Sequence, residues 1–143
     1  MTAAVRGLRR LAGYGLFALL DHLVWIAIVV LPGRRLLDLA RSRPWRGLAL
    51  RLSPAGQRLW ADRIAWLLRT RCRRARWGST CLSRSLSGRV LLDGIGVANE
   101  LHLGMSKGDD GRKVPHAWLR DPGSGRLWTP GLTPGAGAPL TRF

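Results

Sequence analysis

The chain has 143 residues, a length typical of one domain, and its 46% hydrophobic content is enough for one packed core. It carries 24 Lys and Arg against 8 Asp and Glu, giving a formal net charge of +16 at pH 7. Two cysteines, Cys72 and Cys81, argue against a disulfide scaffold and favour a reduced, cytoplasmic setting. No Cys/His spacing fits a zinc site, so we predict neither a metal nor another cofactor.

The positive charge is concentrated at the front of the chain. Residues 1–76 hold 16 Arg and three acids, a balance of +13, whereas residues 77–143 balance at +3. Such charge fits solvated helix faces, an acidic protein partner, an anionic membrane surface or nucleic acid. No helix-turn-helix or RNA-binding signature is present, so we expect no nucleic-acid partner.

The first predicted element is a strongly apolar helix over residues 8–31. Its purest part, residues 16–31, contains Asp21 and His22 and is shorter than the ~20 apolar residues that a bilayer span needs. No small-residue cleavage site typical of a signal peptide follows it. The pattern therefore favours a buried helix or a helix on a membrane surface over a true span.

Two further helices are predicted before residue 77. Pro32-Gly33 ends the first helix, and residues 34–41 form a short amphipathic helix that Arg43-Pro44 terminates. Ser53 as N-cap and Pro54 as first helical residue then start another helix. Its apolar face is predicted from the helical spacing of Trp60, Ile64, Leu67 and Leu68.

The back half changes to mixed helix and strand. A helix over residues 81–92 is expected to end at Asp93-Gly94, and the alternating residues 96–105 predict a strand. A second strand is predicted at 114–119 and, after the turn Asp-Pro-Gly-Ser-Gly, a third at 126–129. The Pro/Gly-rich residues 130–143 are expected to be irregular.

One cysteine and one histidine stand out within this order. Cys81 begins its predicted helix, where the helix dipole and free backbone N–H groups stabilise a thiolate. His116 lies 35 residues on, in the second strand, where it can accept the thiol proton. Each residue alone is more often a buried structural side chain, but together they favour a catalytic pair. Cys72 has no comparable setting.

The motifs around this pair resemble the transglutaminase-like cysteine proteases of lasso-peptide biosynthesis. The chain keeps Cys-Leu-x-Arg-Ser-Leu at 81–86, Gly-Ile at 94–95 and His-Ala-Trp at 116–118. A Leu-Pro-x-Arg-Arg stretch at 31–35 adds a resemblance in the front half. The resemblance implies an α+β fold with a papain/transglutaminase-like core over 77–143, in which the Cys-bearing helix packs on a small antiparallel sheet. An all-helical, Arg/Leu-rich segment over 1–76 would pack on this core or dock partners to it.

The resemblance also implies a function and partners. The enzyme would be a cysteine peptidase that removes the leader from a ribosomally made lasso-peptide precursor. An ATP-dependent macrolactam cyclase would then act on the product. Residues 1–76 contain no strand-bearing recognition module, so a separate small leader-binding protein is expected. A membrane surface is a further candidate partner through residues 8–31, and a catalytically degraded scaffold of the same complex is the alternative function.

The third catalytic residue is the open point of this resemblance. Cys81 would be the nucleophile and His116 the base, but the family's acid normally follows about a dozen residues after the histidine. Leu127-Trp128-Thr129 occupy that place here. Asp121 is the only carboxylate after His116; it is either the orienting acid or a plain turn-former. Otherwise Thr129 or a backbone carbonyl orients the imidazole.

Overall fold

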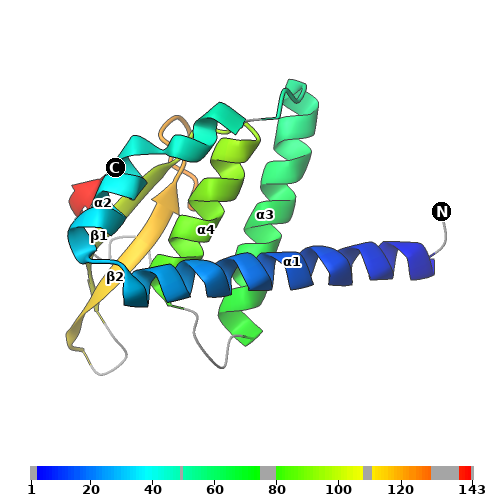
Figure 1. Cartoon of the computed structure of the whole chain (residues 1–143). Helices are drawn as coiled ribbons and strands as arrows, with labels where there is room; N and C mark the ends of the chain where they lie inside the picture. Colours follow the sequence, from blue (N-terminus) through cyan, green and yellow to red (C-terminus); the bar gives the residue numbers. More distant parts are fainter. Residues whose placement is uncertain (1–2, 49, 75–79, 108–110, 130–138, 143) are drawn as a thin grey trace.

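The computed structural model describes residues 3–48, 50–74, 80–107, 111–129 and 139–142 (Figure 1). Within these ranges the front of the chain is helical and the back combines one helix with a sheet, which confirms the predicted α+β class. The elements in chain order are α1 (Ala3–Val30), α2 (Gly33–Ser42), the short 3₁₀ helix η1 (Pro44–Leu48), α3 (Pro54–Arg74), α4 (Cys81–Gly94), β1 (Glu100–Lys107), β2 (Lys113–Arg120) and β3 (Pro139–Arg142).

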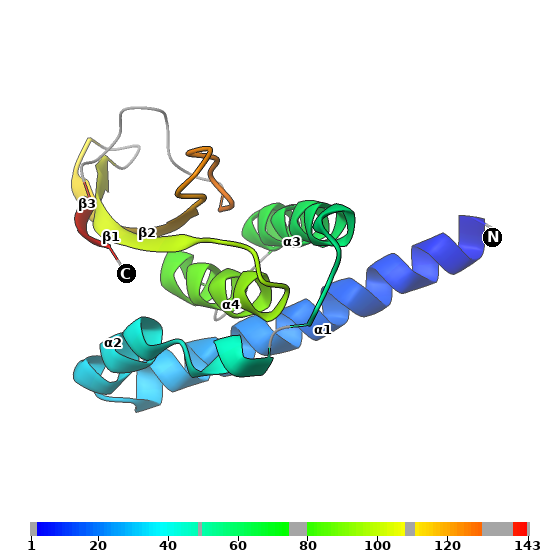
Figure 2. The ribbon, with the colours of Figure 1, turned by 90° about the horizontal axis from the view of Figure 1, so that it is seen from above.

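Helix α4 is the central element of the molecule. Figure 2 shows it between the sheet on one side and α1 and α2 on the other, with α3 alongside. It is therefore buried on several faces, and even its serines at 83, 85 and 87 are inaccessible to solvent. One continuous core joins side chains of α1, α3, α4 and the sheet, among them Phe17, Ile64, Leu68, Leu92, Leu101 and Leu119.

Gly88 sets how closely α4 approaches its neighbours. A Cβ atom at this position would lie 2.9 Å from Leu119 Cδ1 and 3.0 Å from Leu68 Cδ1. These distances are shorter than van der Waals contact, so only glycine lets the helix lie this near to both β2 and α3. The middle of α4 is consequently held close to both neighbours.

The sheet has the order β2-β1-β3, and both pairs are antiparallel. In the first pair Gly104 stands opposite His116 and His102 opposite Trp118. The predicted strands at 96–105 and 114–119 are confirmed, although β1 begins only at Glu100. Because β2 is an edge strand over its first part, its outer backbone groups are open to contacts with α4.

The predicted third strand was placed wrongly. Residues 126–129 form a single bridge between Leu127 and Arg120 instead of a strand, and β3 comes from the tail that was expected to be irregular. The hydroxyl of Thr129 accepts the Leu119 backbone N–H at 3.0 Å, so a side chain replaces the ladder bond that a strand would make. Pro139 is compatible with β3 because it is the strand's first residue.

Two smaller details of the helix predictions were also wrong. Trp60 is 46% exposed, and the buried face of α3 is formed by Ala61, Ile64, Ala65 and Leu68. Helix α4 continues through Gly94, and the glycine with left-handed backbone after it is Gly96, at φ 73°. The predicted N-cap Ser53 is confirmed, since its hydroxyl accepts the Gly56 backbone N–H at 3.2 Å.

The C-terminal end of α4 is tied to the front half by a buried carboxylate. Asp93 accepts hydrogen bonds from Arg43 Nε at 2.9 Å and from Trp45 Nε1 at 2.7 Å, and a second Arg43 nitrogen also contacts it. The Asn99 amide adds a bond of 2.9 Å. A buried carboxylate with this many donors is well satisfied. The contacts of Arg43 and Trp45 with Asp93 therefore fix the α2–η1 connection on α4.

Candidate active site

Cys81 is the first residue of α4, and a capping box closes the helix start that carries it. Thr80 Oγ1 accepts the Ser83 backbone N–H and Ser83 Oγ accepts the Thr80 backbone N–H, each at 3.0 Å. This reciprocal arrangement is a capping box with serine at its third position. It fixes the first turn of the helix and so fixes where the Cys81 thiol points.

A second layer of polar contacts holds the cap from behind. Ser83 Oγ donates to Asp21 Oδ1 at 2.9 Å, and Arg71 Nε donates to Asp21 Oδ2 at 3.0 Å. Asp21 is completely buried. The carboxylate inside the apolar helix α1 therefore joins α1, α3 and α4 beneath the cysteine.

The edge of β2 brings His116 to the same place. Ser85 Oγ, one turn after the cysteine, donates to the Ala117 carbonyl at 3.1 Å. Hydrogen bonding by the His116 side chain and by the Ala117 backbone lowers the pKa of the Cys81 thiol, which places both groups beside it. The structure thus brings together the two residues that the sequence singles out.

The surroundings of Cys81 favour its ionised form. Burial raises the pKa of the thiol, but the hydrogen bonds from His116 and the Ala117 backbone, together with the charges of His116 and Arg84, outweigh it. The net result is a pKa below the ordinary value of a thiol. A lowered pKa at a helix start is the property expected of a nucleophilic cysteine.

His116 is positioned by aromatic neighbours on the same face of the sheet. Its ring stacks on Trp118 with centroids 6.1 Å apart, and Trp118 stacks in turn on His102 at 5.5 Å. The Nε2 atom of His116 is buried, and no hydrogen-bond partner for it is found among the described residues. This is the atom that an orienting third residue would contact if Nδ1 faces the thiol.

The predicted third residue, Asp121, lies in the turn after β2 and bonds within that turn. Its carboxylate accepts Ser124 Oγ at 2.6 Å and the Gly123 backbone N–H at 2.9 Å. The Ser124 bond is the main reason why the pKa of Asp121 lies below its usual range. Among the described residues no hydrogen bond joins Asp121 or Thr129 to His116, so the catalytic role of Asp121 stays a prediction.

The helix start also offers donors for a reacting carbonyl. The cap engages the N–H groups of Thr80 and Ser83, and that of Arg84 bonds to the Thr80 carbonyl. Within the described part of the chain no hydrogen bond is found for the N–H groups of Cys81 and Leu82. Backbone donors of this kind stabilise the oxyanion formed when a thiolate attacks a peptide carbonyl.

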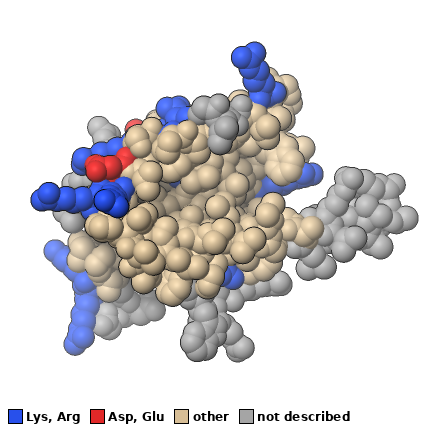
Figure 3. Space-filling view, in the orientation of Figure 1, with Lys and Arg blue, Asp and Glu red and all other residues tan. Residues whose placement is uncertain are grey.

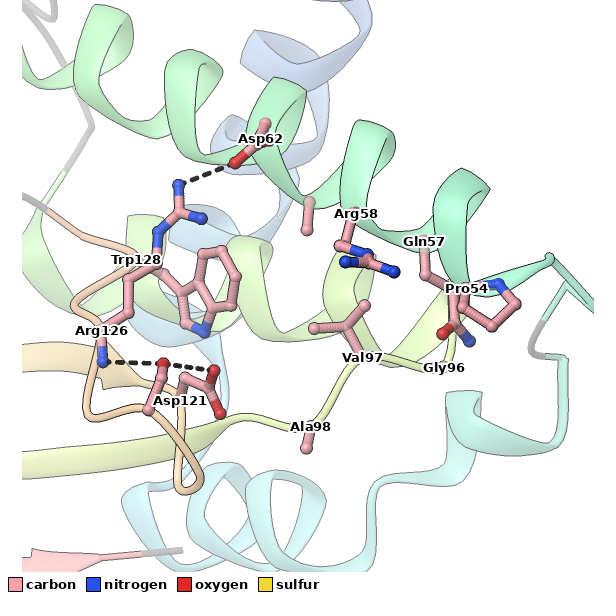
Figure 4. Close-up of a pocket in the computed structure, with 12 residues that line it drawn as sticks. Pro54, Gln57, Arg58, Asp62, Gly96, Val97, Ala98, Asp121, Arg126 and Trp128 are labelled. Carbon is pink, nitrogen blue, oxygen red and sulfur yellow. Dashed lines mark hydrogen bonds and ion pairs between the residues drawn. The ribbon is translucent and has the colours of Figure 1, made fainter.

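An open groove of about 580 Å³ lies near the other end of α4. It runs between α3, residues 96–98 and the turn that contains Asp121, and neither Cys81 nor His116 lines it (Figure 4). Trp128 forms part of its wall, with the Arg126 guanidinium 4.6 Å above the ring and paired with Asp62 at 2.9 Å. The groove therefore contains Asp121 but is separate from the Cys81–His116 pair.

Sequence reasoning missed the residues that support the pair. Thr80 and Ser83 could have been found from the Thr-x-x-Ser spacing at the start of the helix, a weak form of the capping-box pattern. Asp21 was noticed only as a charge that argues against a membrane span. Its partner Arg71 is one of many arginines in α3, and no local signal distinguishes it.

Comparison with known proteins gives one match. The family model described as the transglutaminase-like superfamily matches residues 24–127, a range that includes Cys81, His116 and Asp121. No curated protein and no solved structure shows significant similarity to the chain.

Proposed function

Because this chain belongs to the transglutaminase-like superfamily, we propose that it is a cysteine peptidase with Cys81 as nucleophile and His116 as general base. The superfamily includes hydrolases that use a Cys-His-Asp triad. The observation that carries the proposal is the thiol at a capped helix start, bonded to an imidazole and with a lowered pKa.

The proposed reaction follows from the chemistry of these groups. His116 takes the thiol proton, and the Cys81 thiolate attacks the scissile carbonyl, whose oxyanion accepts bonds from backbone N–H groups at the start of α4. The C–N bond breaks as the imidazolium protonates the leaving amine. Water, deprotonated by His116, then hydrolyses the thioester and regenerates the thiol.

The proposed substrate is the leader of a lasso-peptide precursor. Support comes from the motifs at 81–86 and 116–118, whose spacing resembles the leader peptidases of that biosynthesis. A separate small leader-binding protein would deliver the precursor, and an ATP-dependent cyclase would close the ring afterwards. Every element described within residues 1–76 is helical, which fits a protease half without its own strand-containing recognition module.

Cleavage of the precursor by the purified chain together with its leader-binding partner tests this proposal. Cys81→Ala and His116→Ala should abolish release of the leader, and Cys72→Ala should leave it unchanged. Mass spectrometry of the products identifies the cut site. Equal cleavage by the Cys81→Ala and Cys72→Ala variants would refute the assignment.

A second candidate function is a non-catalytic scaffold of the same maturation complex. It is favoured by one observation, the His116 Nε2 atom that finds no orienting partner among the described residues. A thiol-reactive electrophile separates the two functions. An activated Cys81 should be alkylated at neutral pH much faster than Cys72, whereas equally slow labelling of both thiols would favour the scaffold.

A further inference from the structure

We propose that α1 is an in-plane anchor, which lays one face on an anionic lipid bilayer while its opposite face holds the catalytic helix. The proposal concerns the face of α1 that is turned away from α4 and does not depend on the peptidase function. It rests on the contrast between the buried and the exposed face of α1, on the position of Asp21 and on the charge of the molecule.

The two faces of α1 differ in what they contact. One face carries Phe17, Asp21, Val24 and Ile28, which are buried or partly buried against the rest of the molecule. The other carries a stripe of large apolar side chains that are 42–72% exposed, namely Leu16, Leu19, Leu23, Ile26 and Val30. Their spacing of three and four residues keeps them on one side of the helix.

The stripe is long, continuous and free of charge. Residues Ala12–Val30 are long and apolar enough to cross a membrane, yet only 11% of this window is buried. In Figure 3 the described part of α1 presents a mostly uncharged surface, and Lys and Arg lie mainly toward the margins of the view. Exposed apolar surface of this extent marks an interaction site in a soluble domain.

The position of Asp21 decides between lying on a bilayer and crossing it. It stands nine residues from either end of the apolar window, about 14 Å along the helix axis. Its carboxylate bonds to Ser83 and Arg71, so the globular body is attached at the middle of the window. In a spanning helix, the Asp21 bonds to Ser83 and Arg71 would lie at the centre of the hydrocarbon layer. A helix in the plane of the interface leaves these bonds intact.

Charge favours a bilayer over a second copy of this chain. The three–four spacing would also suit a helical dimer. Each copy, however, carries +16, so two copies repel each other while an anionic surface attracts the molecule. Exposed Arg34 and Arg35 lie four and five residues after Val30, at the start of α2, where we expect them to contact lipid headgroups.

Flotation with sealed vesicles tests the anchor. We expect the full chain to bind phosphatidylcholine vesicles that contain phosphatidylglycerol, and to bind pure phosphatidylcholine vesicles more weakly. Leu19→Gln with Leu23→Gln should weaken binding by about tenfold or more, because two apolar contacts with lipid are lost. Leu50→Gln with Leu59→Gln is the matched control, since these leucines are equally exposed but lie outside α1.

Three results would overturn the proposal. One is equal vesicle binding by the stripe variant and the control. Another is a wild-type chain that does not bind anionic vesicles but forms a dimer, when the Leu19→Gln and Leu23→Gln substitutions abolish that dimer. The third concerns orientation in inside-out membrane vesicles from an expression host. An N-terminal epitope tag should be digested by added protease, and a protected tag would mean that α1 spans the bilayer.

Discussion

The pKa of the Cys81 thiol is set by competition between burial, which raises it, and three groups that stabilise the negative charge of the thiolate. Burial alone would keep the thiol protonated near neutral pH, but His116, the Ala117 backbone and Arg84 lower its pKa. The largest favourable contributions come from His116 and Ala117, and Arg84 acts only through its charge. Substitutions at these side chains should therefore have graded effects.

Replacing His116 should raise the pKa of Cys81 more than replacing Arg84. In a Cys72→Ala background, His116→Ala removes a hydrogen bond and a charge, so burial prevails and the thiol ionises only at higher pH. Arg84→Gln removes one charge and should give a smaller shift in the same direction. The pH dependence of alkylation measures the pKa of Cys81 in each variant. An alkylation midpoint that stays unchanged in His116→Ala would contradict the described coupling.

At the scale of single residues, the sequence was sufficient to single out Cys81 and His116, which lie together, but not the residues that support them. Cys81 and His116 were predicted from their places in a helix–strand–strand order, and the structure brings them together. The pairing of Asp21 with Ser83 joins residues 62 positions apart in the chain. Such a contact depends on how three helices pack, which no local pattern reveals.

Helix α4 is fixed by buried polar contacts at both ends and by close apolar packing in its middle. Asp21 reaches its first turn through Ser83, and Arg43 and Trp45 bind Asp93 near its last turn. Between them Gly88 allows contact with β2 and α3. The contacts at Ser83 and at Gly88 each make a separate prediction about stability.

Ser83→Ala should lower the free energy of unfolding by about 1–2 kcal/mol, because it removes the half of the capping box that accepts the Thr80 backbone N–H and one donor to the buried Asp21. Chemical denaturation measures this difference. Ser42→Ala is the matched control, since Ser42 is exposed and its hydroxyl makes only a 3.5 Å contact within its own helix. If both variants unfold at the same denaturant concentration, the cap does not support α4 as described.

Gly88→Ala should cost about 1–3 kcal/mol, because the added methyl group overlaps Leu119 and Leu68 and forces α4 away from its neighbours. Gly94→Ala tests the same change at the end of the same helix, where a Cβ would meet nothing within 4 Å. That variant should be neutral or slightly stabilising. Thermal unfolding of the pair measures the contrast, and equal destabilisation would mean that close packing at Gly88 is not what matters.

The elements themselves were largely predictable, whereas their partners were not. Helix periodicity and the turn residues located the helices and two strands, because these signals are local. The third strand was missed because β3 pairs with β1 across more than thirty residues of chain. Residues 126–129 were predicted as a strand that follows the tight turn, but the Thr129 side chain takes the bond that a ladder would use.

At the scale of the whole molecule, some of the arginines that give the chain its positive charge make contacts inside the protein. Arg43 and Arg71 pair with the buried carboxylates Asp93 and Asp21. Arg89 is 1% exposed and donates to the Ala40 carbonyl at 3.0 Å. Burial and the nearby charge of Arg43 lower the pKa of Arg89 to about 10, which still leaves it charged at neutral pH. Charge counting alone assigned all these arginines to solvent or partners.

Arg71→Met should destabilise the protein by about 3 kcal/mol or more, because it leaves the Asp21 carboxylate buried without its cationic partner. Burial lowers the pKa of Arg71, but the hydrogen bonds to Asp21 and Tyr14 and their electrostatic attraction together outweigh it and raise the pKa, so the charge is present throughout the usual pH range. Arg58→Met on the exposed side of α3 is the control and should change stability little. Denaturant titration of both variants at neutral pH provides the comparison, and similar values would place Arg71 among the surface charges.

The most direct test of the account is to trap the acyl-enzyme. The chain is mixed with the precursor and its leader-binding partner, quenched in acid within one turnover and examined by mass spectrometry. We predict that the N-terminal fragment of the precursor is found in thioester linkage to Cys81, and that it is absent in His116→Ala. Leader release without any adduct on Cys81, or an adduct on Cys72, would contradict the central claim.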